Sequence, residues 1–242
     1  MLIKTKFKRR DVMKLFKEVD YENSYSKIDG VKALVAFVLM GLIQYGISYL
    51  EICAVNANII KIHANIRYAF CLLVVVFAFV GIKKVNTIGI TKHKILLSIV
   101  LGVVLGVILA ACRIGLARWS ELVEYNALLD NKVQYVLKSL LIVFTEEIVF
   151  RGFIGTRLCG FFKNHIVSSA VTAVLFALYV SLTKVFLLIN GFIPPYMGKL
   201  ILMAVLLHFS TDFIYKLTNN IWGAVVARII CLSAGAIFVL QF

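Results

Sequence analysis

The sequence predicts an all-α protein, a polytopic transmembrane helical bundle of about seven spans with amphipathic helices at the membrane interface. The 242 residues are 62% hydrophobic and 16% charged, and the mean hydropathy is +0.95. These values are typical of a membrane protein and not of a soluble domain. Apolar runs long enough to cross a bilayer recur along the chain, and most lysines and arginines lie between them.

The apolar runs give the expected spans in order. They cover approximately residues 31–50, 66–82, 95–113, 133–152, 165–183, 199–217 and 221–241. The second run is short for a span unless it begins near Ile59. Gly191, Pro194 and Pro195 interrupt the chain between the fifth and sixth runs. We therefore expect a single transmembrane domain over residues 31–242.

Residues 1–30 are expected to form a basic amphipathic segment at the membrane surface. Their apolar stripe at helical spacing consists of Val12, Leu15, Phe16 and Val19. Lysines and arginines surround this stripe, which suits a helix lying on an anionic leaflet. A second short amphipathic helix is expected in the connection 114–132, where Trp119 and Tyr125 suit the interface.

The distribution of positive charge predicts the topology. The basic connections carry Lys83, Lys84, Lys92 and Lys94 after the second run, and Arg157 and Lys163 after the fourth. By the positive-inside rule the N-terminus is cytoplasmic, and an odd number of crossings puts the C-terminus outside the cell membrane. The net charge of +14 then reflects topology and attraction to membrane lipids. No nucleic-acid partner is expected, because the basic residues flank apolar spans.

The cysteines do not indicate a metal site or a disulfide framework. The five are Cys53, Cys71, Cys112, Cys159 and Cys231. They are widely spaced, and no Cys-x-x-Cys pair or cluster of histidines accompanies them. We interpret them as small buried hydrophobic residues, and we expect neither a metal nor another cofactor.

Two adjacent carboxylates and an arginine interrupt the apolar run 133–152. Each charge at a bilayer centre costs about 2.5–3.5 kcal/mol on insertion scales. Glu147 and Arg151 are four residues apart, so they share a helix face and can form an ion pair. Glu146 lies about 100° away on the helix and is expected to remain a free carboxylate. The stretch alone is equally compatible with a purely structural charge cluster.

A second polar group lies in the run 199–217. His208 and Asp212 are four apart and share a helix face. A lone intramembrane histidine is more often a satisfied core residue, but the His–Asp spacing favours a functional site. Arg228 is a further charge in the last run. At about 1.5 Å per residue, Glu146, Asp212 and Arg228 lie at similar depths near the cytoplasmic side, so they can form one polar cluster.

These two motifs carry a family resemblance. Glu-Glu-x-x-x-Arg at 146–151, followed by His-x-x-x-Asp at 208–212, resembles the CPBP family. This family contains the CAAX prenyl endopeptidases, also called Abi proteins, and bacteriocin-processing and immunity relatives. The resemblance covers about residues 133–217 and implies a metal-independent glutamic protease within the membrane.

The resemblance also implies roles for individual side chains. Glu146 would be the general base that activates a water, and Glu147 with Arg151 would support the site. His208 and Asp212 would stabilise the oxyanion. A carboxylate in an apolar span is a credible base, because burial disfavours its charged form.

The middle motif of the family, Phe-x-x-x-His, is incomplete in this chain. Phe176 occupies its first position, and Val180 stands where the histidine is expected. Tyr179 and Ser181 are rotated by about 100° from that position on a helix, so neither replaces the histidine. The missing imidazole and a cation, Arg228, that could face the base both argue for impaired catalysis.

Two functions therefore remain open. The first is a membrane endopeptidase that cleaves peptides or lipidated proteins. The second is a catalytically degenerate relative that binds a peptide or membrane-protein partner as a scaffold, immunity or regulatory protein. A transporter is a third class, but the sequence shows no inverted repeat. The sequence also contains neither His-Glu-x-x-His nor Gly-x-Ser-x-Gly, which argues against a zinc or serine hydrolase.

Overall fold

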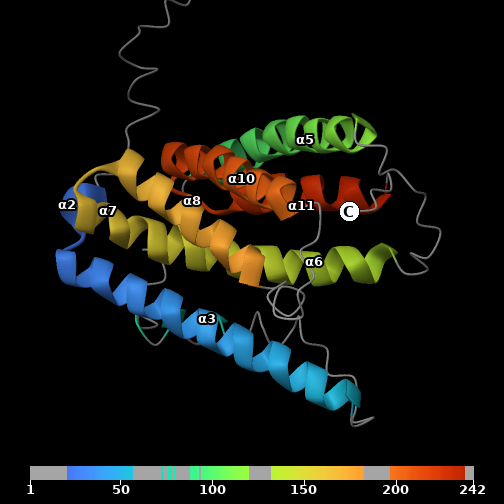
Figure 1. Cartoon of the computed structure of the whole chain (residues 1–242). Coiled ribbons are helices and arrows are strands. Elements are labelled where there is room, and N and C mark those ends of the chain that lie inside the picture. The colour runs from blue at the N-terminus through green and yellow to red at the C-terminus, as the bar shows by residue number, and fades with distance from the viewer. Residues whose placement is uncertain are drawn as a thin grey trace, which may run out of the picture.

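The computed structural model describes residues 21–56, 72–73, 76–77, 79, 88–92, 94–119, 132–182 and 197–237. In these residues the secondary structure is helical, without strands, as predicted. The helices are α2 (Tyr21–Ser24), α3 (Lys27–Asn56), α5 (Ile95–Trp119), α6 (Lys132–Glu147), η2 (Ile148–Gly155), α7 (Thr156–Phe162), α8 (His165–Leu182), α10 (Met197–Thr218) and α11 (Trp222–Ile237). Figure 1 shows α3 along one side of the bundle and α5 along the opposite side.

The helices agree with most of the expected spans. The first, third, fifth, sixth and seventh apolar runs each coincide with one helix, and the fourth lies on α6 and η2. Two segments, Ile95–Gly115 and Ile201–Thr218, are long and apolar enough to cross a membrane by length and composition. The second run lies largely outside the described residues, as do residues 1–20 and most of the connection 114–132. The number of crossings and the amphipathic helices thus stay predictions.

The helix expected to end at residue 152 continues for almost three more turns. After α6 the chain passes without a break into the π-helix η2 and then into α7, which ends at Phe162. Arg157, expected in a loop, is therefore a buried residue of α7, with its guanidinium 4.2 Å from the centre of the Phe153 ring. Lys163 then ends the helix in the left-handed conformation, with φ at 53°.

Polar caps fix the starts of two helices. At α3, Ser26 and Asp29 form a capping box: the Ser26 backbone N–H donates to Asp29 Oδ2 at 3.0 Å, and the Asp29 N–H donates to Ser26 Oγ at 3.3 Å. The bond from the Ser26 N–H is the main reason why the pKa of Asp29 is lowered. At α8, Asn164 Oδ1 accepts from the backbone N–H groups of Ile166 and Val167 at 2.9 and 3.1 Å.

A seam of small residues holds α11 against α5. Gly102 on α5 lies directly against the backbone of Gly223, so that a Cβ at either position would collide with the other helix. One turn further along, a Cβ on Gly106 would come within 3.0 Å of the Ala227 Cα. One turn earlier, Ser98 Oγ accepts from the Gly223 N–H at 2.9 Å. This small-xxx-small spacing lets two helix backbones approach closely, and it fixes the depth and rotation of α11.

The apolar core surrounds η2. Phe150 is fully buried and meets the Phe176 and Tyr179 rings of α8, each at a centroid distance of 5.1 Å. Gly152 lies so close to the Ile88 carbonyl that a side chain there would collide with it. By contrast, α5 exposes Leu96, Val100, Val103, Val104, Val107 and Ile108. A continuous apolar face of this kind suits contact with lipid.

Candidate active site

Glu146 and Glu147 end α6, and Arg151 follows in η2. The predicted ion pair between Glu147 and Arg151 is present: Arg151 Nη1 donates to Glu147 Oε2. The Glu147 side chain is fully buried, and that of Arg151 is 1% exposed. Burial of this kind is tolerated when each charge is paired and hydrogen-bonded.

Arg151 also fixes α10 to this pair. Its Nη2 donates to the His208 backbone oxygen at 3.0 Å and to the Thr211 hydroxyl. The π-helix supplies the position from which the arginine makes these contacts, and such segments are frequent at functional sites. Neither Thr211 nor the π-helix was anticipated from the sequence, because helical periodicity does not signal a π-helix.

Glu146 is not the free carboxylate that the sequence suggested. Arg228, on α11, donates through Nη2 to Glu146 Oε2 and through Nη1 to Glu147 Oε1, the latter at 2.8 Å. Spacing along one helix suggested a free carboxylate, whereas the depth estimate had placed Arg228 in one cluster with Glu146, where it could face the base. The small-residue seam with α5 sets α11 at the depth where Arg228, next to Ala227, reaches both acids.

The two carboxylates differ in their surroundings. Glu147 is enclosed by Arg151 and Arg228, and its side chain is fully buried. The Glu146 side chain is 11% exposed, and only its Oε2 is bonded among the described residues. Of the adjacent acids, Glu146 is thus the one with an oxygen available to another molecule.

His208 lies in the same region with no hydrogen bond to its ring. It is fully buried, and neither Nδ1 nor Nε2 has a partner among the residues that the structure describes. Its ring lies 5.5 Å from the Phe176 ring, with 31° between the planes. The Arg228 guanidinium lies over the same Phe176 ring, 4.9 Å from its centre. Phe176 therefore links the histidine to the charged groups.

Asp212 belongs to the edge of this group and has its own partners. Its Oδ2 accepts from the Ser169 hydroxyl on α8 and pairs with Lys216 Nζ at 2.9 Å, one turn along α10. Lys216 could have been anticipated from its four-residue spacing to Asp212, whereas Ser169 could not, because it comes from another helix. We refer to Glu146, Glu147, Arg151, His208, Asp212 and Arg228 as the polar network.

The incomplete middle motif contributes one residue to the polar network and one to the core. Phe176 meets both His208 and Arg228, as described above. Val180, one turn further along α8, is partly buried and packs against the apolar core cluster. Among the described residues, no three His, Cys, Asp or Glu side chains come together in a way that could hold a metal ion.

Comparison with known proteins gives one match. Residues 129–233 match the family model described as Type II CAAX prenyl endopeptidase Rce1-like. The match covers less than half of the chain, and it supports the resemblance of this segment to the CPBP family. The matched segment begins just before α6 and ends within α11, so it contains every residue of the polar network. The searches of curated proteins and of solved structures found no match.

At the level of the family, the match supports a CAAX-protease-like membrane protein. The two motifs on which the resemblance rested both lie in the matched segment, and the fold brings them together through Arg151 and the backbone of His208.

Proposed function

We propose that this chain is an intramembrane endopeptidase, which cleaves peptide or lipidated-protein substrates near the cytoplasmic face with a water activated by Glu146. The observation that carries the proposal is His208. Both nitrogens of the buried His208 ring are without a partner among the described residues, which costs about 1–3 kcal/mol. A bound carbonyl oxygen would accept from its N–H and recover that cost.

The arrangement supports a simple reaction. Glu146 Oε1 takes a proton from water while the water oxygen attacks the carbonyl carbon of the scissile peptide bond. The negative charge that develops on the carbonyl oxygen accepts a hydrogen bond from the neutral His208 ring. The C–N bond then breaks, and Glu146 returns the proton to the leaving amine. Glu147 and Arg151 do not touch the reacting atoms; they hold α6 and α10 in place.

A second candidate is a catalytically degenerate relative that binds a peptide or membrane-protein partner. Two observations favour it. Val180 provides no hydrogen bond for a water at the position of the missing histidine. In addition, Arg228 occupies one of the two Glu146 oxygens.

Cleavage by the purified protein in liposomes tests the proposal. The substrates are a set of peptides ending in Cys-aliphatic-aliphatic-X, each with and without a prenyl group on the cysteine, with products measured by mass spectrometry. Glu146→Gln keeps the shape but loses the base, so cleavage should fall by about 10²–10⁴-fold. Asp29→Asn is the matched control, because it removes a carboxylate at the start of α3, outside the polar network, and should leave the rate unchanged.

The two candidates differ in outcome. Cleavage that Glu146→Gln abolishes supports the endopeptidase. A well-folded wild-type protein that cleaves none of the peptides, or that cleaves them no faster than the Glu146→Gln variant, would favour the degenerate relative.

A further inference from the structure

Two donors contact one oxygen of the Asp212 carboxylate. Ser169, on α8, donates its hydroxyl to Oδ2, and Lys216 Nζ lies 2.9 Å from the same oxygen. Lys216 also donates to the backbone oxygen of His165 at 3.0 Å. Although it lies near the end of α10, the Lys216 side chain is only 22% exposed. Its ammonium is therefore fixed between two acceptors and is not a freely moving surface charge.

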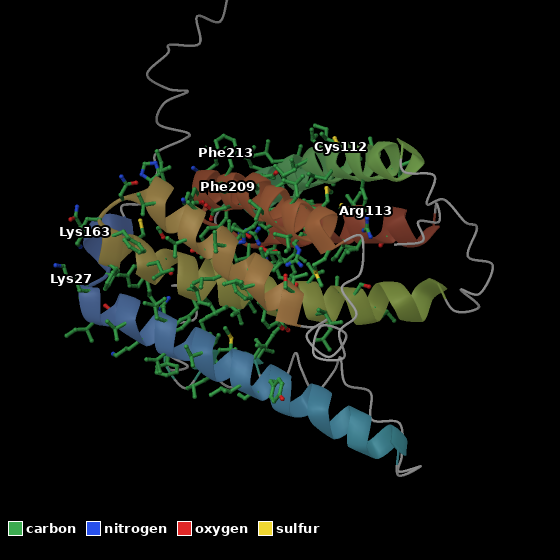
Figure 2. The ribbon with its side chains drawn as sticks, viewed as in Figure 1. Lys27, Cys112, Arg113, Lys163, Phe209 and Phe213 are labelled. Atoms are coloured by element: carbon green, nitrogen blue, oxygen red, sulfur yellow. The ribbon has the colours of Figure 1, made fainter. Side chains whose placement is uncertain are left out.

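The position of this ion pair matters because of the residue one turn away. His208, Asp212 and Lys216 follow one another at four-residue intervals, so they lie along one face of α10. The neighbouring face, about 100° around the helix, carries Phe209 and Phe213, which are 40% and 66% exposed (Figure 2). The polar face leads from the buried imidazole to the end of the helix.

A carboxylate one turn along the helix from His208 does not by itself suit a site that stabilises an oxyanion. A carboxylate has no hydrogen to donate, and its negative charge repels a second one that develops nearby. Ser169 donates to Asp212 but brings no charge. Lys216 supplies the positive charge that the structure pairs with this carboxylate.

We infer that Lys216 is a positioning residue of the reaction: its ammonium neutralises Asp212 and keeps the oxyanion side of the site free of net negative charge. This inference rests on the proposed endopeptidase function. It adds Lys216 to the site residues of the two motifs. A neutral side chain at position 212 would bring no negative charge to the oxyanion side, and the pair of Asp212 and Lys216 achieves the same result together.

The alternative is a structural clamp between α8 and α10, and kinetics separate the two. The full-length protein in liposomes is compared with Lys216→Met and Lys216→Arg, and kcat, KM and the melting temperature are measured for each. We expect Lys216→Met to lower kcat at least about tenfold with little change in KM, because the lost charge acts in the transition state. Lys216→Arg keeps the charge and should retain most of the activity.

The decisive comparison is the effect of Lys216→Met on kcat in the wild type and in the Asp212→Asn variant. An asparagine is neutral and can itself donate, so Lys216→Met should change kcat by less than about threefold when it is added to Asp212→Asn. Lys163→Met is the control, because Lys163 Nζ also donates to a backbone oxygen but lies at the end of α7 and bonds Tyr25 at 3.2 Å (Figure 2). It should leave kcat unchanged in both backgrounds.

Each outcome is informative. If Lys216→Met lowers the melting temperature but not kcat, or lowers kcat equally in the wild-type and Asp212→Asn backgrounds, Lys216 is a clamp and the inference is wrong. If the wild type shows no cleavage that depends on Glu146, the proposed function fails and this inference fails with it. If cleavage depends on Glu146 but does not change in Lys216→Met, the inference about Lys216 is wrong and the proposed function stands.

Discussion

Arg228 Nη1 and Glu147 Oε1 lie 2.8 Å apart, although 81 residues separate them in the chain. This contact joins the end of α6 to the middle of α11. Glu147 also accepts a hydrogen bond from Arg151, which in turn donates to the His208 backbone oxygen on α10. The buried Glu147 carboxylate thus connects α6, α10 and α11. The polar network is therefore a tertiary junction as well as a candidate catalytic site.

Replacing Arg228 should destabilise this junction strongly. Arg228→Gln leaves Glu146 without its cation and removes one partner of Glu147, and breaking a buried pair costs about 3–5 kcal/mol. Thermal unfolding in detergent measures the loss. Arg113→Gln is the matched control: Arg113 bonds the Cys231 backbone oxygen at 3.2 Å, so its loss should cost only about 1 kcal/mol. Equal losses for the two variants would contradict the junction.

A double-mutant cycle should detect the pair of Glu147 and Arg151. Arg151→Ala leaves Glu147 with Arg228 as its one remaining cation, and Glu147→Ala removes the carboxylate that pairs with Arg151. Either change unbalances the buried charges, and the free energy of unfolding should fall by several kcal/mol, on the order of 3–5. The double variant restores charge balance, so its loss should be smaller than the sum of the single losses. Strict additivity would show that the two side chains do not interact.

The small-residue seam predicts opposite effects for two glycines of α5. Gly102→Ala should lower the melting temperature markedly, because the new Cβ collides with the Gly223 backbone. Gly115→Ala places the same methyl group in open space on the same helix, where alanine is favoured over glycine by about 0.5–1 kcal/mol. The control should thus be neutral or stabilising. An unchanged melting temperature for Gly102→Ala would mean that α5 and α11 are less closely packed than described.

Val180→His should increase cleavage. An imidazole at this position restores the middle motif of the family, and such acid–base groups typically contribute about 10²–10⁴-fold. Because Val180 packs against the apolar core, some loss of packing is also expected. The gain must disappear when Glu146→Gln is added. Val180→Gln controls for polarity, because it introduces hydrogen-bonding groups without a titrating ring. Robust wild-type turnover that does not respond to Val180→His would show that another residue completes the site.

The topology prediction can be tested with reporter fusions. The lysines in residues 1–30 and 83–94 predict that a reporter inserted after Lys84 is active in the cytoplasm. A reporter after Phe242 should be active outside. A cytoplasmic C-terminus would mean that the number of crossings is even, and the short second apolar run would then be the first to reconsider.

The sequence predicted most helices because long apolar runs leave few alternatives to a helix in lipid. It also predicted the pair of Glu147 and Arg151, whose four-residue spacing is local. It failed for Glu146, because the partner of Glu146 lies on α11 and the rotation of α11 is set by glycines that carry no charge. Pairs within one helix could be predicted directly, whereas between helices the sequence indicated a cluster with Arg228, and only the fold gave the individual contacts.

The continuation of α6 into η2 and α7 shows a second limit. The apolar run was expected to end at residue 152, and the charge of Arg157 placed that residue in the following connection. The structure retains the helix because Gly152 packs against the Ile88 carbonyl and Arg157 is covered by aromatic rings. These tertiary contacts outweigh the low helix propensity of glycine, which is worth only about 1 kcal/mol per residue.

Because α11 packs on α5, the folding unit extends beyond the segment that matches the family model. The matched segment begins at residue 129, whereas α5 ends at Trp119. A protein trimmed to 129–233 would retain both motifs and Arg228, but it would lose the glycine surface on which α11 is seated. Such a fragment would contain the complete set of site residues without the means to align them, and grafting this segment into another membrane protein would have to bring α5 with it.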